Sequence, residues 1–242
     1  MHQIILCGIN IHSQHIHMYK YKSKRGFTLI ELLVVISVIL IASSIIFIGG
    51  NGGAGASLSS SQRIVSGITK GARGQAILKN ARVRLIIYTD NPNNSNEEKY
   101  LRYFGIVYED NDNPGLWIAA TQGTFLPEGV YFDAALSSRN GWSIPNWPST
   151  ATMSLEYPRN IAKSEGSGDE FYYYEFNSNG TVSSIPIDFV NSWIVIRAGV
   201  LKPTTAGALA LEIEEGQESI VSALILRRAG TTTPVNEPSD IL

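Results

Sequence analysis

Residues 24–35 read Lys24-Arg25-Gly26-Phe27-Thr28-Leu29-Ile30-Glu31-Leu32-Leu33-Val34-Val35, and the chain then stays almost wholly apolar to Ile48. As one helix, residues 27–48 would rise roughly 33 Å at about 1.5 Å per residue, against a bilayer hydrocarbon core of about 30 Å. This length predicts a transmembrane helix. Its one charged residue, Glu31, would be costly in hydrocarbon, and such a group usually serves a function.

The segment before this helix is basic. Lys20, Lys22, Lys24 and Arg25 precede Gly26, and a cluster of this kind holds the preceding segment in the cytoplasm. Together with these residues, the string from Gly26 to Val34 resembles the class III signal of type IV prepilins and type II secretion pseudopilins.

The resemblance implies a processing site, a modification and a set of partners. In that family a prepilin peptidase cuts after the glycine and methylates the new amino terminus, which here means the Gly26–Phe27 bond and the Phe27 amine. The family's glutamate is held to neutralise the amino terminus of a neighbouring subunit, so the resemblance gives Glu31 a role in assembly. The implied partners are other pseudopilins or pilins and the inner-membrane assembly platform. The implied location is the bacterial inner membrane, crossed once, with a cytoplasmic N-terminus and a periplasmic C-terminal domain.

Two other interpretations of the apolar span stay open. Ala54-Gly55-Ala56 has the small-x-small form of a signal peptidase site, although a secretory signal normally has an apolar core of about 7–15 residues. A plain signal anchor would explain the length and the basic flank, but not the string from Gly26 to Glu31.

Composition is consistent with one anchor and one globular domain. The chain has 242 residues, of which 44% are hydrophobic and 17% charged, values that exclude both a disordered chain and a multi-span membrane protein. We expect a leader over 1–26, with Met18 as a possible true start, and a transmembrane helix over 27–48. A glycine-rich joint over 49–56 and a globular domain over 57–242 follow.

Cleavage after Gly26 would remove every cysteine and histidine of the chain. The one cysteine is Cys7, and the four histidines also precede the cut: His2, His12, His15 and His17. A mature chain without them cannot form a disulfide, a zinc–thiolate site or a histidine-based triad. We therefore expect no enzyme and no cofactor, although a Ser–Lys dyad stays open. The cut also leaves 15 basic against 21 acidic side chains, a net charge of −6, so nucleic acid is not an expected partner.

Beyond the joint, the hydrophobic period predicts a helix and then a sheet. Leu58, Val65, Ile68, Ala72 and Ala76 recur at helical spacing, which predicts an amphipathic helix over about 57–78. Expected strands are Val83 to Tyr88, Tyr100 to Tyr108, Leu116 to Ala120, Gly129 to Phe132, Phe171 to Phe176, Thr181 to Ile187, Trp193 to Arg197 and Ile220 to Leu226. Asn177-Ser178-Asn179-Gly180 predicts a hairpin turn. The order indicates an α+β fold, a long N-terminal helix on an antiparallel sheet, which is also the pilin architecture.

Later segments carry a finer resemblance. The stretches 72–77, 83–85, 104–110 and 176–180 resemble the H-type minor pseudopilins, and the FimT-like minor pilins share them. Residues 134–168 and 201–218 have no clear counterpart in that family. The preferred hypothesis is a minor pseudopilin of a type II secretion pseudopilus. The alternatives are a FimT-like minor type IV pilin in DNA uptake or adhesion, and a membrane-anchored domain that does not polymerise.

Three further clusters were candidates for binding. Asp110 and Asp112 match the first and third ligand positions of a calcium loop, but Pro114 occupies the fifth, so a polar turn is the competing interpretation. Arg227 and Arg228, with Arg82, Arg84 and Lys79, could form a patch for DNA, or could be solvated charges at strand edges. The aromatic run 171–176 could stack on a ligand, but its alternation favours a core strand.

Overall fold

The computed structural model describes residues 28–48, 51–90, 96–137, 152–183, 191–205 and 207–241, and the side chains of 41–52 are not described. The leader, Met18 and the predicted processing residues Lys24, Arg25, Gly26 and Phe27 lie outside this part of the chain. The chain divides into two compact units, Met1–Ile48 and Gly49–Leu242. Each unit is considered by itself.

The first unit contains one helix, α1 (Leu29–Ile48). Its described side chains, from Leu29 to Leu40, are all exposed, so the unit has no core of its own in this range. Across the described residues, no helix is both long enough and apolar enough to be assigned as a membrane span.

The second unit begins with the long helix α2 (Asn51–Lys79). The helix starts before Ser57, where its start was expected, so residues 51–56 of the expected glycine-rich joint are helical. Each glycine costs about 1 kcal/mol in a helix interior, yet extending an existing helix is far easier than nucleating one. The predicted apolar stripe is confirmed: Val65, Ala72 and Ala76 are fully buried.

The larger sheet has seven strands among the described residues, all paired antiparallel in the order β6-β8-β1-β2-β3-β7, with β4 beside β2. Its strands are β1 (Val83–Tyr88), β2 (Tyr103–Glu109), β3 (Leu116–Ala119), β4 (Thr124–Phe125), β6 (Thr152–Leu155), β7 (Lys163–Ser164) and β8 (Asp169–Phe176). Central strand β1 is buried along its whole length, because both faces of the sheet are covered.

A second sheet of four strands among those described has the order β13-β12-β9-β5, and β10 and β11 pair separately as a ribbon. The bounds are β5 (Val130–Phe132), β9 (Ser192–Ala198), β10 (Val200–Pro203), β11 (Leu209–Glu212), β12 (Val221–Leu226) and β13 (Thr232–Val235). Two short 3-10 turns complete the described elements, at Glu97–Lys99 and at Pro238–Asp240.

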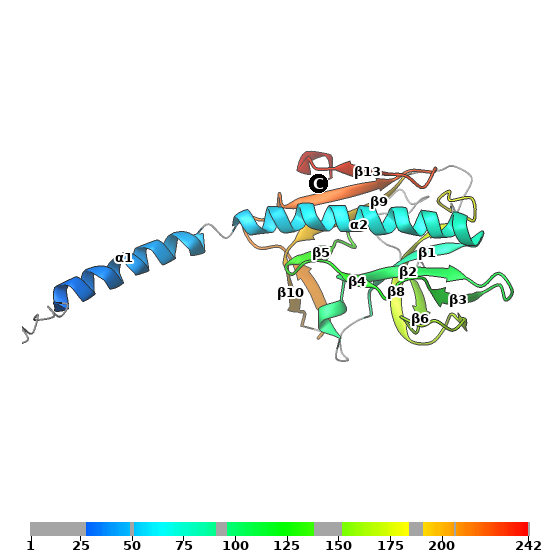
Figure 1. The fold of residues 1–242 in the computed structure, drawn as a ribbon, viewed down its shortest axis with the longest axis horizontal. Coiled ribbons are helices and arrows are strands. Elements are labelled where there is room, and N and C mark those ends of the chain that lie inside the picture. Colours follow the sequence, from blue (N-terminus) through cyan, green and yellow to red (C-terminus); the bar gives the residue numbers. More distant parts are fainter. Residues whose placement is uncertain are drawn as a thin grey trace, which may run out of the picture. The chain divides into compact units, whose positions relative to one another are not determined.

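The main core lies where α2 meets both sheets. In Figure 1, α2 crosses the second unit with β9 and β13 on one side and β1 and β2 on the other, and it packs on strands of both sheets. This core includes Val65 and Ala72 of α2, Leu85, Tyr174 and Leu224. A second core covers the opposite face of the larger sheet, around Trp117, Tyr157 and Phe171. The α+β expectation, a helix on antiparallel sheet, is confirmed.

Seven of the eight expected strands appear as strands, with ends that differ from the expected ones by at most three residues. The segment expected as Thr181 to Ile187 is reduced to one bridge between Phe176 and Val182 within its described part, and 184–187 lie outside the description. The predicted turn is present: Gly180 has a φ of 78°, and its N–H donates to the Asn177 carbonyl. Six short strands were not predicted: β4, β6, β7, β10, β11 and β13. Each has two to four residues, and its ends are set by pairing with another strand.

Candidate functional site

The amino-terminal end of α1 is closed by Thr28 and Glu31. The Thr28 backbone N–H and hydroxyl each donate to a Glu31 carboxylate oxygen at 2.8 Å, and the Glu31 N–H donates back to the Thr28 hydroxyl at 3.2 Å. This reciprocal pattern is a capping box, which satisfies backbone donors that the first helical turn leaves free. The carboxylate therefore has a partner within its own helix.

This local role of Glu31 was not predicted from the sequence, although a signal was present. Thr28-Leu29-Ile30-Glu31 has the Thr-x-x-Glu spacing of a capping box just before an apolar run. A role for Glu31 in assembly is not excluded by the cap, because exposed carboxylates accept more than two hydrogen bonds. That role stays a prediction, as do the cleavage at Gly26–Phe27 and the methylation of Phe27.

The arginines of the proposed basic patch are occupied by carboxylates. The Arg82 guanidinium donates through Nε to Glu109 at 2.6 Å and makes a second bond to the same carboxylate through a terminal nitrogen. Arg84 donates to Glu175 at 2.7 Å and also pairs with Glu165. The two arginines therefore cannot serve as free cations for phosphate.

Arg84 also lies between two aromatic rings. Its guanidinium is 4.1 Å from the centre of the Trp117 ring and 4.0 Å from that of Tyr173. Arginine stacks on aromatic faces while its planar donors bind carboxylates, so one side chain joins β1, β3 and β8. Sequence reasoning could not find this cluster, because Trp117, Glu165 and Tyr173 are remote in the chain from Arg84.

The hydrogen bond between Arg82 and Glu109 shifts the pKa of each group towards its charged form. The hydrogen bond from Arg82 lowers the pKa of Glu109, with a smaller contribution from the Gly115 N–H, and these outweigh the opposing effect of burial. The same hydrogen bond raises the pKa of Arg82. Both groups therefore remain charged over the ordinary pH range, which suits a structural ion pair and not a proton-transfer site.

Arg227 and Arg228 lie on the turn between β12 and β13 of the second sheet, whereas Arg84 lies on β1 of the larger sheet and Arg82 directly precedes β1. Arg227 Nε donates to the Thr233 hydroxyl at 3.2 Å, and the Arg228 carbonyl accepts from Val182 N–H. Arg73 of α2 reaches the same turn, where its Nε donates to the Ala229 carbonyl at 3.0 Å. Arg227 and Arg228 therefore share this turn with Arg73. The expected patch had combined them with Arg82 and Arg84.

The loop that carries Asp110 and Asp112 is held by its own hydrogen bonds. Asp110 accepts from the Asp112 N–H at 3.2 Å and from the Asn113 amide at 2.9 Å. Its neighbour Glu109 is taken by Arg82 and the Gly115 N–H. In the described part of the chain, no group of three or more His, Cys, Asp or Glu side chains is placed to hold a metal ion. The geometry is that of a polar turn between β2 and β3.

The aromatic run of β8 is a core element, as predicted. Phe171, Tyr174 and Phe176 are fully buried, and they divide between the two cores on opposite faces of the sheet. The Tyr174 hydroxyl donates to the Trp193 carbonyl at 2.8 Å, which ties the larger sheet to β9. These side chains do not form a ligand-stacking surface.

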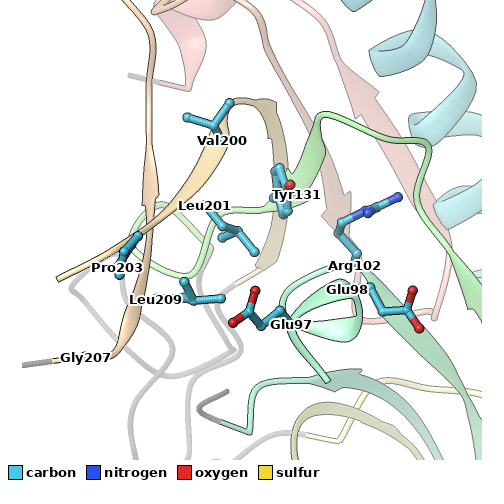
Figure 2. Close-up of a pocket in the computed structure, with 9 residues that line it drawn as sticks. All are labelled: Glu97, Glu98, Arg102, Tyr131, Val200, Leu201, Pro203, Gly207 and Leu209. Carbon is cyan, nitrogen blue, oxygen red and sulfur yellow. The ribbon is translucent and has the colours of Figure 1, made fainter. Parts of the chain in front are cut away.

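A cavity of about 510 Å³ lies between the Glu97–Lys99 turn and the β10–β11 ribbon. Figure 2 shows Glu97 directed towards Leu201 and Leu209, with Tyr131 and Arg102 on another side. The Arg102 guanidinium is engaged: it donates to the Leu126 carbonyl at 3.0 Å and lies 5.8 Å from the Tyr131 ring centre. The lining combines an apolar wall with carboxylates and carries no paired nucleophile and base among its residues.

Comparison with known proteins agrees with the amino-terminal motif. Residues 21–47 match the family model described as the prokaryotic N-terminal methylation motif. This match covers three of the four basic residues, Gly26, Phe27, Glu31 and nearly all of α1, and it indicates a type IV pilin-like protein that prepilin peptidase processes. No curated protein and no solved structure gives a significant match to the chain.

Proposed function

We propose that this protein is a minor pseudopilin of a type II secretion pseudopilus, a structural subunit with no enzymatic activity. The observation that carries the proposal is the methylation motif over 21–47, which is followed by a long helix packed on antiparallel sheet. A subunit of this kind is held first in the inner membrane by residues 27–48 and then enters the filament through the same helix. The absence of Cys and His after residue 17 supports a structural role.

The proposed processing predicts a mature amino terminus at Phe27 that carries a methyl group. Intact-mass analysis of the protein from membranes would give the mass of residues 27–242 plus one methyl group. A terminus after Ala56, or a chain that retains residues 18–26, would contradict the proposal. Gly26→Ala provides the matched variant, because a peptidase that requires glycine at the cut should leave this chain unprocessed.

The filament system is tested in a deletion strain. If the protein is a secretion pseudopilin, we expect the deletion strain to lose protein secretion and to keep normal DNA uptake. The wild-type gene should restore secretion, and the Gly26→Ala gene should not. The reverse pattern would favour the minor type IV pilin. Normal secretion and uptake, with the protein present in membranes but missing from sheared filaments, would favour the anchored domain that does not polymerise.

A further inference from the structure

The charges on α2 are all of one sign. Arg63, Lys70, Arg73 and Lys79 are its basic residues, and it contains no Asp or Glu. This helix belongs to a mature chain of net charge −6, so its exposed face is a basic strip on an acidic protein. Such a local reversal of sign attracts an acidic partner and orients it.

Two of these cations border a groove. Arg63 and Lys70 are exposed and line a hollow of about 430 Å³ between α2 and the β12–β13 hairpin, and neither has an ion pair among the described residues. The other lining residues are Gln62, Ser66, Gly67, Leu224, Pro234 and Asn236, with no carboxylate among them. By contrast, Arg73 is bound to the Ala229 carbonyl and Lys79 lies 4.8 Å from the Tyr108 ring centre.

The walls of this groove are held in place. Gln62 donates from its amide nitrogen to the Ala223 carbonyl at 3.1 Å and to the Val235 carbonyl at 3.4 Å. Ser66 and Thr232 share a hydroxyl hydrogen bond at 3.1 Å. A groove fixed from both sides loses little conformational entropy when a ligand enters, which favours binding.

The complementary surface lies elsewhere on the same chain. Residues 209–218 contain four glutamates and no basic residue. Glu212 pairs with Lys202 at 2.9 Å, whereas the carboxylates of Glu214, Glu215 and Glu218 have no cationic partner among the described residues. Gly216, at a φ of 83°, turns the chain here and leaves Glu214 and Glu215 exposed.

We propose that the α2 groove binds the acidic 212–218 turn of a second copy of this chain. Arg63 and Lys70 would face Glu214 and Glu215 across the contact. The two surfaces are different parts of the molecule, so the contact is head-to-tail and each bound copy leaves one groove and one turn free for the next. The inference rests on the proposed function, since it assigns a lateral contact between subunits of a filament.

Nucleic acid fits this groove less well than the acidic turn does. Phosphate binding gains with every added cation, and the groove offers two on a chain of net negative charge. The acidic turn supplies three carboxylates that have no cationic partner among the described residues, and it belongs to the same protein as the groove.

The contact can be tested by cysteine crosslinking of the full chain in native membranes. Cys7→Ala removes the one native cysteine. One tagged copy then carries Gly67→Cys in the groove and another carries Ser219→Cys beside the turn, both at exposed positions. We expect a mixed dimer on oxidation, and no such dimer when Ser167→Cys, exposed on the β7–β8 loop, replaces Gly67→Cys.

Charge reversal identifies the groups responsible. Lys70→Glu in one copy, or Glu215→Lys in the other, should lower the crosslinking yield about five- to tenfold, as expected for one or two partly exposed ion pairs. The two reversals together should restore much of the yield. Lys79→Glu is the matched control, because Lys79 does not line the groove, and it should leave the yield unchanged.

The possible outcomes separate this inference from the proposed function. The inference alone would be overturned if processing and filament incorporation are normal but the Gly67→Cys and Ser219→Cys copies do not crosslink. The same holds if the crosslinking yield does not change on charge reversal. A charge-dependent crosslink between chains that are neither processed nor assembled would support the contact and reject the function. If a short DNA duplex binds the wild-type chain, loses affinity with Lys70→Glu and displaces the crosslink, the groove is a nucleic-acid site and the inference fails.

Discussion

Gly105 in β2 lies under the ring of Tyr157, so any added side chain would have to displace that ring. A Cβ at this position would be 1.9 Å from the Tyr157 hydroxyl oxygen and 2.6 Å from the adjoining ring carbon. That hydroxyl donates to the Thr121 carbonyl at 2.8 Å and lies 2.9 Å from the Thr121 hydroxyl. Burial also raises the pKa of Tyr157 to about 12, so the phenol stays protonated and can donate.

We therefore predict that Gly105→Ala lowers the free energy of unfolding by about 2 to 3 kcal/mol, from overpacking together with the lost hydrogen bond. Urea denaturation measures this. Tyr157→Phe on the Gly105→Ala background removes the clashing hydroxyl and should recover part of the loss. An unchanged urea midpoint for Gly105→Ala would mean that the ring moves aside at little cost.

The second residue-level prediction concerns acid stability. The pKa of Glu109 is lowered in the folded protein, chiefly by the Arg82 hydrogen bond, so its stabilising effect is complete above the unfolded value of about 4.3. That effect is lost as the pH falls through the lower folded pKa. Glu109→Gln should be less stable than wild type near neutral pH, and should lose less stability on acidification from about pH 6 to about pH 3.

Urea midpoints at several pH values between those limits would measure the slope of stability against pH. Glu98→Gln is the control, because Glu98 is exposed and has no ion pair among the described residues. It should follow the wild-type slope. The interpretation would be wrong if Glu109→Gln and wild type lost stability in parallel.

At the scale of elements, α2 is held against the sheets by small residues. Ala72 and Ala76 are fully buried, and their short side chains allow the helix to approach β1 and β2 closely. Gly71 is exposed, but an added Cβ there would be 3.5 Å from Ile106 of the sheet, whereas a Cβ at Gly67 or Gly74 would meet nothing within 4 Å. The three glycines therefore do not share one packing role.

Ala72→Leu should destabilise the second unit by about 1 to 3 kcal/mol, because the added volume has no space in the core. Gly74→Ala is the matched change on the open face and should stabilise the helix by up to about 1 kcal/mol. Thermal melting of the two variants gives opposite shifts if the face assignment is right. A loss of stability in both would instead indicate that the outer face of α2 is also packed.

The first turn of α1 raises a separate question, because Glu31 could act by capping its own helix or by pairing with another subunit. Thr28→Ala removes the two hydroxyl hydrogen bonds of the cap and keeps the carboxylate and its bond from the backbone N–H, whereas Glu31→Ala removes the carboxylate and both of its hydrogen bonds. We predict that both variants are cleaved normally, since the peptidase reads Gly26 and the basic flank. Filament incorporation should fall strongly for Glu31→Ala alone, because an amine buried without its carboxylate is costly.

Crosslinking to sheared filaments measures incorporation, and intact mass measures cleavage. Equal incorporation defects in Thr28→Ala and Glu31→Ala would show that the cap, and not an intersubunit pair, is what assembly requires. Wild-type incorporation of Glu31→Ala would remove the carboxylate from the assembly mechanism.

At the scale of the whole molecule, the buried clusters found in the described chain lie in the second unit, from Leu58 onward. A chain that starts at Asn51 should therefore fold alone as a soluble domain with one cooperative melting transition. Reducing agent should not change the melting temperature, because the one cysteine is Cys7. Aggregation of this chain, or a broad melt, would show that residues before Asn51 are needed for folding.

The sequence by itself determined the features that depend on local pattern. These are the amino-terminal motif over 21–47, the apolar stripe of α2, the change to strands at Val83 and the burial of the aromatic run in β8. Each follows from residue spacing or propensity within one segment. Helix α2 starts at Asn51, earlier than the expected start near Ser57, because local propensity does not include the stabilisation that a docked helix gains from its packed turns.

Tertiary structure alone decided which charges are free. Arg82 and Arg84 look like available cations in the sequence, but strand pairing between β1, β2 and β8 brings Glu109 and Glu175 against them. Arg63 and Lys70 lie next to no acidic residue in the chain, yet only the position of the β12–β13 hairpin makes them the edge of a groove. Partners separated by many residues meet through the fold, because the contacts between sheets and helix are set by packing and not by local sequence.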